Sequence, residues 1–550
     1  MRRGALTGGI ALLVLALAGC VGIPMSGGVL PGPVIDEQLD PEVVVLASGP
    51  VPGSDQQQIL TDFMQAVRSP QNDYAIAKQF LTPGLEVSWK PNASTIIRST
   101  ASVSPGATTD TLSYTVASRA TVDGDGRYTA QRDVSSQTLT FGFAQVDGEW
   151  RISQAADGIV LSASSFEVAF REQALYFFDP SHGYLVPDVR WFPARATAPI
   201  RVVGALLAGP SDWLQQGVVQ TAFPVATALG NGSVVVTGSS ATVDLSPEAL
   251  AASAQERDWM RQQLAATLDT PNVTMTVGGR ELPTPDPSGT SAFVDPSVDG
   301  AALVGLADRF GFDGGDGIVA IENLSDKVVA AGATTAVLSA DLGVVAFRAG
   351  DGSVGVATLG EDALPLDARP GLIAPSLDPF RFVWSVQGGN AASVVTFELD
   401  GASHPVQSAL PANASVVSMD VSRDGTRLLV YLTAPTGPRL VVAGIIRQDN
   451  VPIALGPLLE LPVGTAGPVD ATWVDDRSVA TLAADGEVSV FGIGGPASSL
   501  GQAAAGSTIV GGNNGTDGIR VLAGGELWRP QGSAGWVSTL IPASFLATKQ

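Results

Sequence analysis

The residue best suited to covalent chemistry is Cys20, the one cysteine in a chain of 550 residues. It follows Leu17-Ala18-Gly19, which end an uncharged apolar run from Ile10, and Arg2 and Arg3 precede the run. A positive start, a short apolar run and small residues at a cleavage point form the layout of a secretory signal peptide. The run is shorter than an ordinary membrane span. The pattern therefore predicts a signal peptide over residues 1–19, cleaved between Gly19 and Cys20.

The segment Leu17–Cys20 also has the pattern of a bacterial lipobox. In that motif the cysteine thiol is alkylated with diacylglycerol, and the new terminal amine is acylated, with palmitate as the expected chain. Two or more lipid chains give stable anchoring. We therefore predict a lipid anchor on Cys20 and a mature chain on the extracytoplasmic face of the cell membrane. Free secretion after ordinary cleavage is the alternative, whereas Gly8, Gly9 and Gly19 interrupt the run and disfavour a signal anchor.

Composition restricts the remaining chemistry. The net charge of −23 should repel nucleic acid and anionic headgroups, so no nucleic-acid partner is expected. Lipidation of Cys20 would leave no thiol for disulfide, iron–sulfur or thiolate–zinc chemistry. Two histidines, His182 and His404, supply little for metal binding or acid–base catalysis. We predict no metal, no cofactor and no catalytic residue.

The first folded region is expected over residues 56–165, after a tether rich in Pro and Gly over 20–55. Apolar spacing predicts helices over 56–69 and 73–81, and alternation predicts strands near 112–116, 139–143 and 150–152. Helices followed by a strand meander indicate a curved sheet wrapped on a helix, a cone-like shape typical of nuclear-transport-factor-like domains. Asp62, Asp73 and Glu86 are interpreted as helix-surface or capping groups.

The second region is expected over residues 172–282. Strands are predicted over 174–178, 217–221, 234–237, 241–245 and 273–277, and helices over 199–209 and 247–269. The order β-α-β-β-α-β indicates a small α/β sandwich. His182 is placed in a turn, where we expect it to be solvated.

The third region, over residues 300–545, reads as strands alone and follows a linker rich in Pro over 283–299. A turn with aspartate that leads into an apolar strand recurs at Asp341, Asp378, Asp424, Asp476 and Asp517. The separations suit one four-stranded blade of a β-propeller, with five to six blades in all. A β-sandwich with similar turns is the alternative. The predicted fold is therefore multidomain, with two α+β regions followed by an all-β propeller.

Short motifs in the chain resemble known families. The motifs of the second region that resemble the GerMN domain are Leu206–Pro210, Ala222–Pro224, Thr242–Leu245 and the passage 266–277. The order of regions, with Cys20–Pro24, Ser26–Gly28 and Gly148–Ile152, resembles the LpqB lipoproteins of actinobacteria. That resemblance implies a non-catalytic accessory of the MtrA–MtrB two-component system, which contacts the extracellular part of the kinase MtrB and influences the cell envelope and division.

A cell-envelope glycan-binding protein, or a glycan hydrolase or lyase, is the alternative from another class. A glycosidase needs two carboxyl groups at a fixed separation, and 53 acidic residues leave that open. The turn aspartates have a structural explanation, since Asp side chains bond the backbone of tight turns. Calcium at Asp123-Gly124-Asp125 is weakly supported, because the segment lacks a closing bidentate carboxylate.

Overall fold

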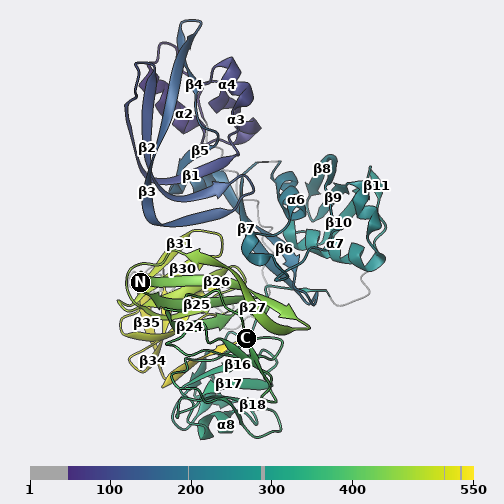
Figure 1. Cartoon of the computed structure of the whole chain (residues 1–550), viewed down its shortest axis with the longest axis vertical. Helices are drawn as coiled ribbons and strands as arrows, with labels where there is room; N and C mark the ends of the chain where they lie inside the picture. Colours follow the sequence, from purple (N-terminus) through teal and green to yellow (C-terminus); the bar gives the residue numbers. More distant parts are fainter. Residues whose placement is uncertain (1–46, 196, 286–290, 513–514, 533–534) are drawn as a thin grey trace, which may run out of the picture. The chain divides into compact units, whose positions relative to one another are not determined.

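The computed structural model describes residues 47–195, 197–285, 291–512, 515–532 and 535–550 (Figure 1). It contains two α+β regions followed by an all-β propeller, so the predicted fold class is confirmed. The predicted cleavage and lipidation residues, Gly19 and Cys20, lie outside the described residues, as does most of the predicted tether.

The first region is a five-stranded sheet with helices on one face (Figure 1). The helices are α2 (Gln56–Ala66), α3 (Gln71–Lys78) and α4 (Pro83–Ser88). The strands, in the order β4-β3-β2-β1-β5, are β1 (Ser94–Pro105), β2 (Thr111–Asp123), β3 (Tyr128–Val146), β4 (Glu149–Gln154) and β5 (Ile159–Ser162). Helix α2 begins where Asp55 accepts a bond from the amide of Gln58, and its buried face carries Ile59, Leu60, Phe63 and Ala66. The predicted helix over 56–69 is confirmed but ends earlier.

The second region has two sheets around helices α6 and α7. Its elements are α5 (Ala163–Ala169), β6 (Phe170–Phe178), β7 (Tyr184–Pro193), α6 (Ala198–Ala208), η1 (Asp212–Leu214), β8 (Leu229–Thr237), β9 (Ser240–Leu245), η2 (Pro247–Ala251), α7 (Ala254–Thr267), β10 (Asn272–Val277) and β11 (Arg280–Glu281). One sheet has the order β11-β10-β9-β8. The other has the order β12-β7-β6, and its strand β12 (Phe293–Val294) comes from the segment predicted as a linker.

Two predictions in this region were wrong. Residues 217–221 form no strand, and only Gln220 makes an isolated bridge, to Phe178. The helix predicted over 247–269 is two elements, because Ala252 is extended and Ser253 starts α7 afresh. Ser253 and Glu256 form a capping box there, in which each side chain bonds the backbone of the other residue.

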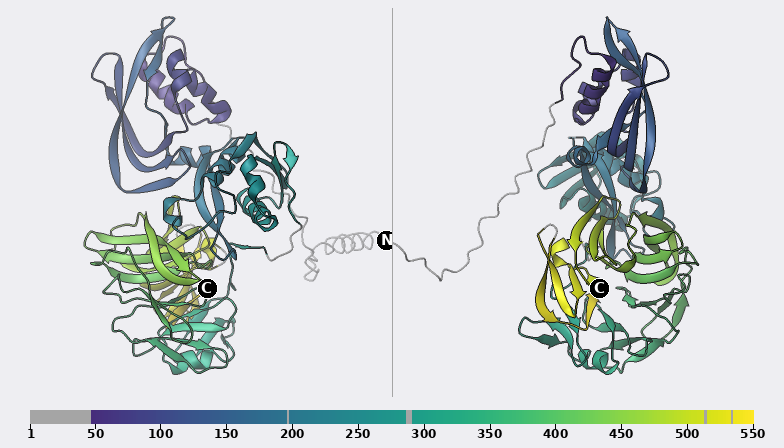
Figure 2. Two further views of the ribbon diagram at one scale, coloured as in Figure 1. Left: turned by 45° about the vertical axis from the view of Figure 1, so that its right-hand side comes forward. Right: turned by 90° about the vertical axis from the view of Figure 1, so that its left-hand side faces the viewer.

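The described residues of the propeller form six blades around a common axis (Figure 2), and β36 joins the first two blades into one eight-stranded sheet. Blade 1 contains β13 (Leu303–Gly305), β14 (Phe310–Asp313), β15 (Ile318–Ala320) and the last strand, β36 (Phe545–Lys549). Blade 2 contains β16 (Thr335–Leu338), β17 (Val344–Arg348), β18 (Val354–Thr358) and β19 (Leu364–Asp367), and helix α8 (Ser325–Ala330) precedes it. Blade 3 contains β20 (Ser376–Leu377), β21 (Val383–Ser385), β22 (Val395–Phe397) and β23 (Ser403–Pro405).

The next three blades are complete four-stranded sheets. Blade 4 contains β24 (Ser415–Val421), β25 (Arg427–Ala434), β26 (Gly437–Gln448) and β27 (Val451–Leu461). Blade 5 contains β28 (Pro468–Trp473), β29 (Ser478–Ala483), β30 (Glu487–Gly492) and β31 (Ala497–Gln502). Blade 6 contains β32 (Gly506–Val510), β33 (Arg520–Ala523), β34 (Glu526–Gln531) and β35 (Gly535–Pro542), with η3 (Gly515–Gly518) before β33. Strand β36 closes the ring, because it pairs with β13 of blade 1 and with β16 of blade 2.

The five copies of the predicted repeat lie in blades 2 to 6, each in the turn between the first and second strands of its blade. The carboxylates of Asp341, Asp378 and Asp424 each accept a bond from the amide two residues later. In the fourth copy this role belongs to Asp475 instead of Asp476, since the amide of Arg477 donates to Asp475 at 2.9 Å. The fifth copy forms the short helix η3, and the part of Asp517 that accepts a bond there is its backbone carbonyl.

Candidate functional site

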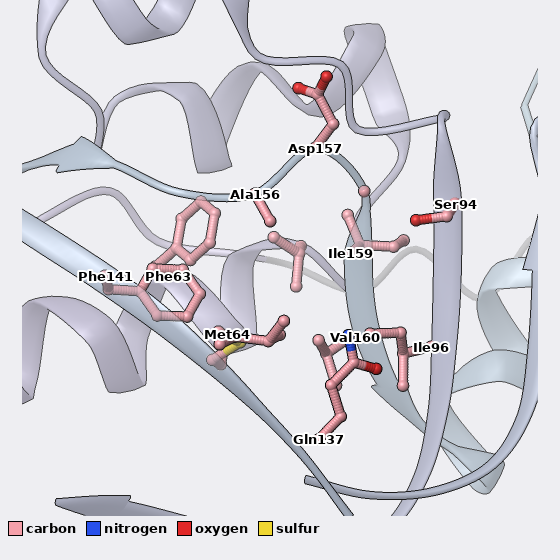
Figure 3. A pocket seen from close by; sticks show the side chains of 13 residues that line it. Phe63, Met64, Ser94, Ile96, Gln137, Phe141, Ala156, Asp157, Ile159 and Val160 are labelled. Carbon is pink, nitrogen blue, oxygen red and sulfur yellow. The ribbon is translucent and has the colours of Figure 1, made fainter. Parts of the chain in front are cut away.

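A cavity of about 100 Å³ opens between helix α2 and the sheet of the first region (Figure 3). Most of its lining is apolar: Phe63, Met64, Val67, Ile96, Leu139, Phe141, Ala156, Ile159 and Val160. Ser94, Gln137, Asp157 and Gly158 complete the lining. An apolar cavity with a few polar groups at its edge is the general form of a small-molecule site.

The regular spacing of helix and strand residues builds this cavity. Phe63 lies on α2 and Val67, one turn later, caps the C-terminal end of that helix, while Leu139 and Phe141 share one face of β3. The rings of Phe63 and Phe141 meet edge to face with centroids 6.3 Å apart, and Trp89 lies behind Phe63 at 5.5 Å. The wall is therefore fixed by packing, as expected of a preformed site.

The polar groups of this cavity offer no acid–base pair. Asp157 is its one carboxyl group, and in Figure 3 that side chain points away from the other labelled groups. The Asp157 carboxylate accepts a bond from the backbone amide of Lys90 at 2.9 Å. Gln137 turns its amide toward Val160. The arrangement can hold an apolar group with one hydrogen-bonding function, and it has no second carboxyl group for hydrolysis.

The acidic residues singled out in the first region have structural roles. Asp62 accepts a bond from Gln58 within α2, and Glu86 lies in the exposed first turn of α4. Asp73 pairs with Lys78 and Arg195, and the hydrogen bond from Lys78 is the main reason that its pKa is lowered.

The turn at Asp123 and Asp125 carries its own counterion. The guanidinium of Arg127 lies 2.7 Å from the Asp125 carboxylate and 3.4 Å from that of Asp123. The guanidinium of Arg127 therefore pairs with the same two carboxylates that were considered as calcium ligands. Across the part of the chain that the structure describes, no group of three His, Cys, Asp or Glu side chains is arranged to hold a metal ion.

His182 lies in the expected turn, but the prediction that it is solvated was wrong. Its ring stacks on Trp259 with centroids 3.7 Å apart, and the Gln220 side chain approaches at 3.2 Å. Burial lowers the pKa of His182, so the neutral imidazole is favoured at neutral pH. The sequence does not reveal this contact, because His182 and Trp259 are far apart along the chain.

The turn aspartates of the propeller are bound by neighbouring groups. Asp424 is buried against Arg427, with side chains 2 % and 0 % exposed. Asp378 accepts bonds from the indole of Trp384 at 2.9 Å and from Arg447 at 2.6 Å. These carboxylates stabilise turns and join blades, which agrees with the structural explanation given for them.

A second set of buried carboxylates, which the sequence did not reveal, joins the first strands of neighbouring blades. Asp420 of β24 accepts bonds from Ser376 of β20 and from Thr472 of β28. Asp470 of β28 accepts bonds from Ser418 of β24 and from the amide of Ile509 of β32. Burial raises the pKa of both Asp420 and Asp470 to about 6. These partners of both carboxylates lie in the first strands of neighbouring blades. We therefore assign Asp420 and Asp470 to contacts between blades.

Comparison with known families finds a matching family model for each of the three regions. The model described as the N-terminal domain of lipoprotein LpqB matches residues 49–167. A model for sporulation and spore germination, Germane, matches residues 174–283, and the LpqB β-propeller model matches residues 313–541. The chain belongs to the LpqB lipoprotein family. The resemblance inferred from the short motifs is thus confirmed.

LpqB relatives come from several bacteria. Lipoprotein LpqB of Cutibacterium acnes is 30% identical over 288 residues, which are 50% of this chain and 47% of that protein. Lipoprotein LpqB of Nocardia farcinica is 32% identical over 228 residues, which are 40% and 37% of the two chains. The chain therefore spans about half the length, or less, of these relatives. The tandem GerMN domains of GerM from Bacillus subtilis are 19% identical, covering 26% of this chain and 58% of that one, with a TM-score of 0.18.

Membership of the LpqB lipoprotein family indicates anchoring to a membrane. Of the helices that the structure describes, none has both the length and the apolar character of a membrane span. The LpqB models describe a lipoprotein and a propeller, and neither description names an enzyme.

Proposed function

We propose that the chain is a non-catalytic accessory lipoprotein, held by lipid on Cys20 at the extracytoplasmic face of the cell membrane. There it binds the extracellular domain of a sensor kinase similar to MtrB and modulates the response of the two-component system in envelope homeostasis and cell division. Family membership supports the lipid anchor and the accessory role. The kinase partner rests on the family resemblance.

The proposal that the chain is non-catalytic rests on the partners of two carboxyl groups that the structure describes. Asp341 and Asp378 line the same cavity beside the propeller, and a glycosidase needs two carboxyl groups at a fixed separation. Each of them is ion-paired, Asp341 with Arg381 and Asp378 with Arg447, both at 2.6 Å. A general acid needs a raised pKa, whereas the bond from Ser339 leads the causes that lower the pKa of Asp341.

The acidic charge of the chain favours a basic patch on the partner. With a net charge of −23, attraction to such a patch would speed association and weaken as salt rises. The cavity of the first region adds an apolar recess that could receive one side chain of a partner. These features suit recognition of a protein surface.

The proposal is tested by a pull-down of the chain from residue 21 with the sensor domain of the kinase. We expect capture that weakens between 50 and 500 mM salt, and loss of capture when residues 172–550 are deleted. A chain that carries Asp62→Asn, an exposed helix-surface change, serves as the matched control. Absence of capture at low salt would contradict the kinase as partner.

A glycan hydrolase or lyase is the second candidate, supported only by the two carboxyl groups in the propeller cavity. It predicts that purified envelope glycan is cleaved, and that Asp341→Asn or Asp378→Asn abolishes cleavage. We expect no cleavage by the unaltered chain.

A further inference from the structure

A cavity of about 210 Å³ opens where the turns of three consecutive blades meet Tyr184 of β7, the segment 296–298 and Gln550. Ser339 and Asp341 come from the turn of blade 2, Asp378 and Arg381 from that of blade 3, and Arg423 from that of blade 4. Its charged side chains are therefore two carboxylates and two guanidinium groups.

Both carboxylates are already bound. Asp341 accepts bonds from the Ser339 hydroxyl at 2.5 Å and from Arg381 at 2.6 Å. Asp378 accepts two backbone amides, the Trp384 indole and the Arg447 guanidinium. Neither carboxylate is left to neutralise a further cation.

Of the four charged side chains in this cavity, Arg423 is the one without an ion-pair partner among the described residues. Its Nε atom has no accessible surface and no hydrogen-bond partner, and its guanidinium makes no hydrogen bond or ion pair with any residue that the structure describes. Two other arginines of blade 4 differ in their terminal nitrogens, since Arg427 pairs with Asp424 and Arg447 with Asp378, although the Nε of Arg427 is also without a partner. Burial is the main cause that lowers the pKa of Arg423, while more distant carboxylates, of which Asp420 comes first, oppose that change.

Other cations gather around this position. The pKa of Lys549 is lowered to about 8, first by burial and then by repulsion from Arg423 and Arg520. The ammonium of Lys549 donates to the carbonyls of Asp299 and Ala301, and it lies 5.5 Å from the ring of Phe312. The carboxylate of Asp299 opposes the fall in the pKa of Lys549, as Asp420, Asp295 and Asp475 do for Arg423. Among the described residues, however, none of these carboxylates forms an ion pair with either cation.

We propose that this propeller cavity binds an anionic group, a carboxylate or a phosphate, with Arg423 as its principal ligand. A largely buried charge is stable only when it is paired and hydrogen-bonded. The planar guanidinium fork matches the paired oxygens of carboxylate and phosphate. The negative charge of the rest of the chain would repel free anions, so binding depends on this cavity rather than on the general surface.

The test is thermal unfolding of the full-length chain in sodium phosphate, sodium succinate and sodium chloride at equal ionic strength. We expect phosphate, succinate or both to raise the Tm by about 2–4 °C over chloride. A response to phosphate alone assigns a phosphate site, and a response to succinate alone assigns a carboxylate site. Equal Tm values in all three salts would overturn the proposal.

Variants separate a ligand-binding arginine from a structural one. Arg423→Met should remove the anion-dependent rise and should also raise the Tm in chloride, because it eliminates an unpaired charge. Arg423→Lys keeps the charge without the planar fork and should give a smaller anion-dependent rise in Tm than the parent chain. The control is Arg309→Met, since Arg309 is 60% exposed and lies in another turn. An Arg423→Met chain that still responds to the anion as the parent does would overturn the proposal.

Discussion

The ring of Phe545 lies directly on the backbone of Gly305, so close that a Cβ atom at Gly305 would fall 2.1 Å from that ring. These residues are register partners in β36 and β13, where the last strand joins the first blade. Phe545 also stacks on Phe310 with centroids 5.9 Å apart. The closure of the ring is therefore a packed contact that requires a residue without a side chain at position 305.

Gly305→Ala should destabilise the propeller by about 1–3 kcal/mol, because the added methyl group displaces Phe545 from a filled core. Urea unfolding followed by tryptophan fluorescence measures the change in the free energy of unfolding. Gly464→Ala is the matched control, since nothing lies within 4 Å of a Cβ at that position. Equal effects of the two substitutions would refute the role given to this contact.

Asp424→Asn should cost about 3–5 kcal/mol, because it leaves the buried guanidinium of Arg427 without its counterion. The equivalent substitution in another blade, Asp341→Asn, breaks a pair whose side chains are more than half exposed and should cost about 0–1 kcal/mol. Both changes are measured by urea unfolding. Similar losses at the two positions would contradict the assignment of Asp424 and Arg427 to the core.

The stability of the propeller should fall as pH rises from 5 to 8. Burial is the main cause that raises the pKa of Asp476 to about 7, and the charge of Asp295 adds to it. The unfolded pKa is about 3.9, so the folded state binds the proton more tightly. The resulting stabilisation is complete below about pH 4 and is lost as pH rises through 7.

Asp476→Asn removes this titration and should reduce the slope of the unfolding free energy against pH, leaving the part that Asp420 and Asp470 contribute. Urea unfolding at pH 5, 6, 7 and 8 gives the two slopes. Asp485→Asn, in an exposed turn of the same blade, should keep the slope of the parent chain. Parallel curves for Asp476→Asn and the parent would show that this carboxyl group does not titrate in that range.

Cys20→Ala should release the protein from the membrane fraction or leave an unprocessed precursor, because the thiol that accepts diacylglycerol is absent. Cell fractionation and the mass of the mature chain measure the two effects. Ser26→Ala, just past the predicted cleavage point, is the control and should remain in the membrane fraction. Unchanged processing and unchanged membrane association of Cys20→Ala would disprove the lipid anchor.

The order of regions could be predicted from the sequence because helical and strand periodicities differ over long stretches. Strand β7 was missed because Pro187 interrupts its apolar run. Proline is tolerated on unpaired strand edges, and β12 pairs only with Tyr184 and Leu185, which leaves that edge of Pro187 free. The break between η2 and α7 was readable, since Ser253 and Glu256 have capping-box spacing.

The candidate sites were less predictable than the fold. Apolar spacing predicts the helix over 56–69, but nothing in that spacing shows that its packing leaves a cavity beside Phe63 and Met64. The unpaired guanidinium of Arg423 could not be predicted from the sequence either, because Arg427, four residues later at the start of β25, does pair with a carboxylate, that of Asp424. Whether an arginine has a partner depends on which blades meet, and that is a property of the closed ring.

Closure by β36 also imposes an order on synthesis. Strand β13 is made early, yet it receives its partner only after residues 545–549 have been made. Until then blade 1 has an open inner edge, which is a template for pairing with other chains. Contacts between the ends of so long a segment also form slowly. During synthesis there is therefore a period in which blades 2 to 6 can form while blade 1 is still incomplete. In that period the chain needs protection from aggregation.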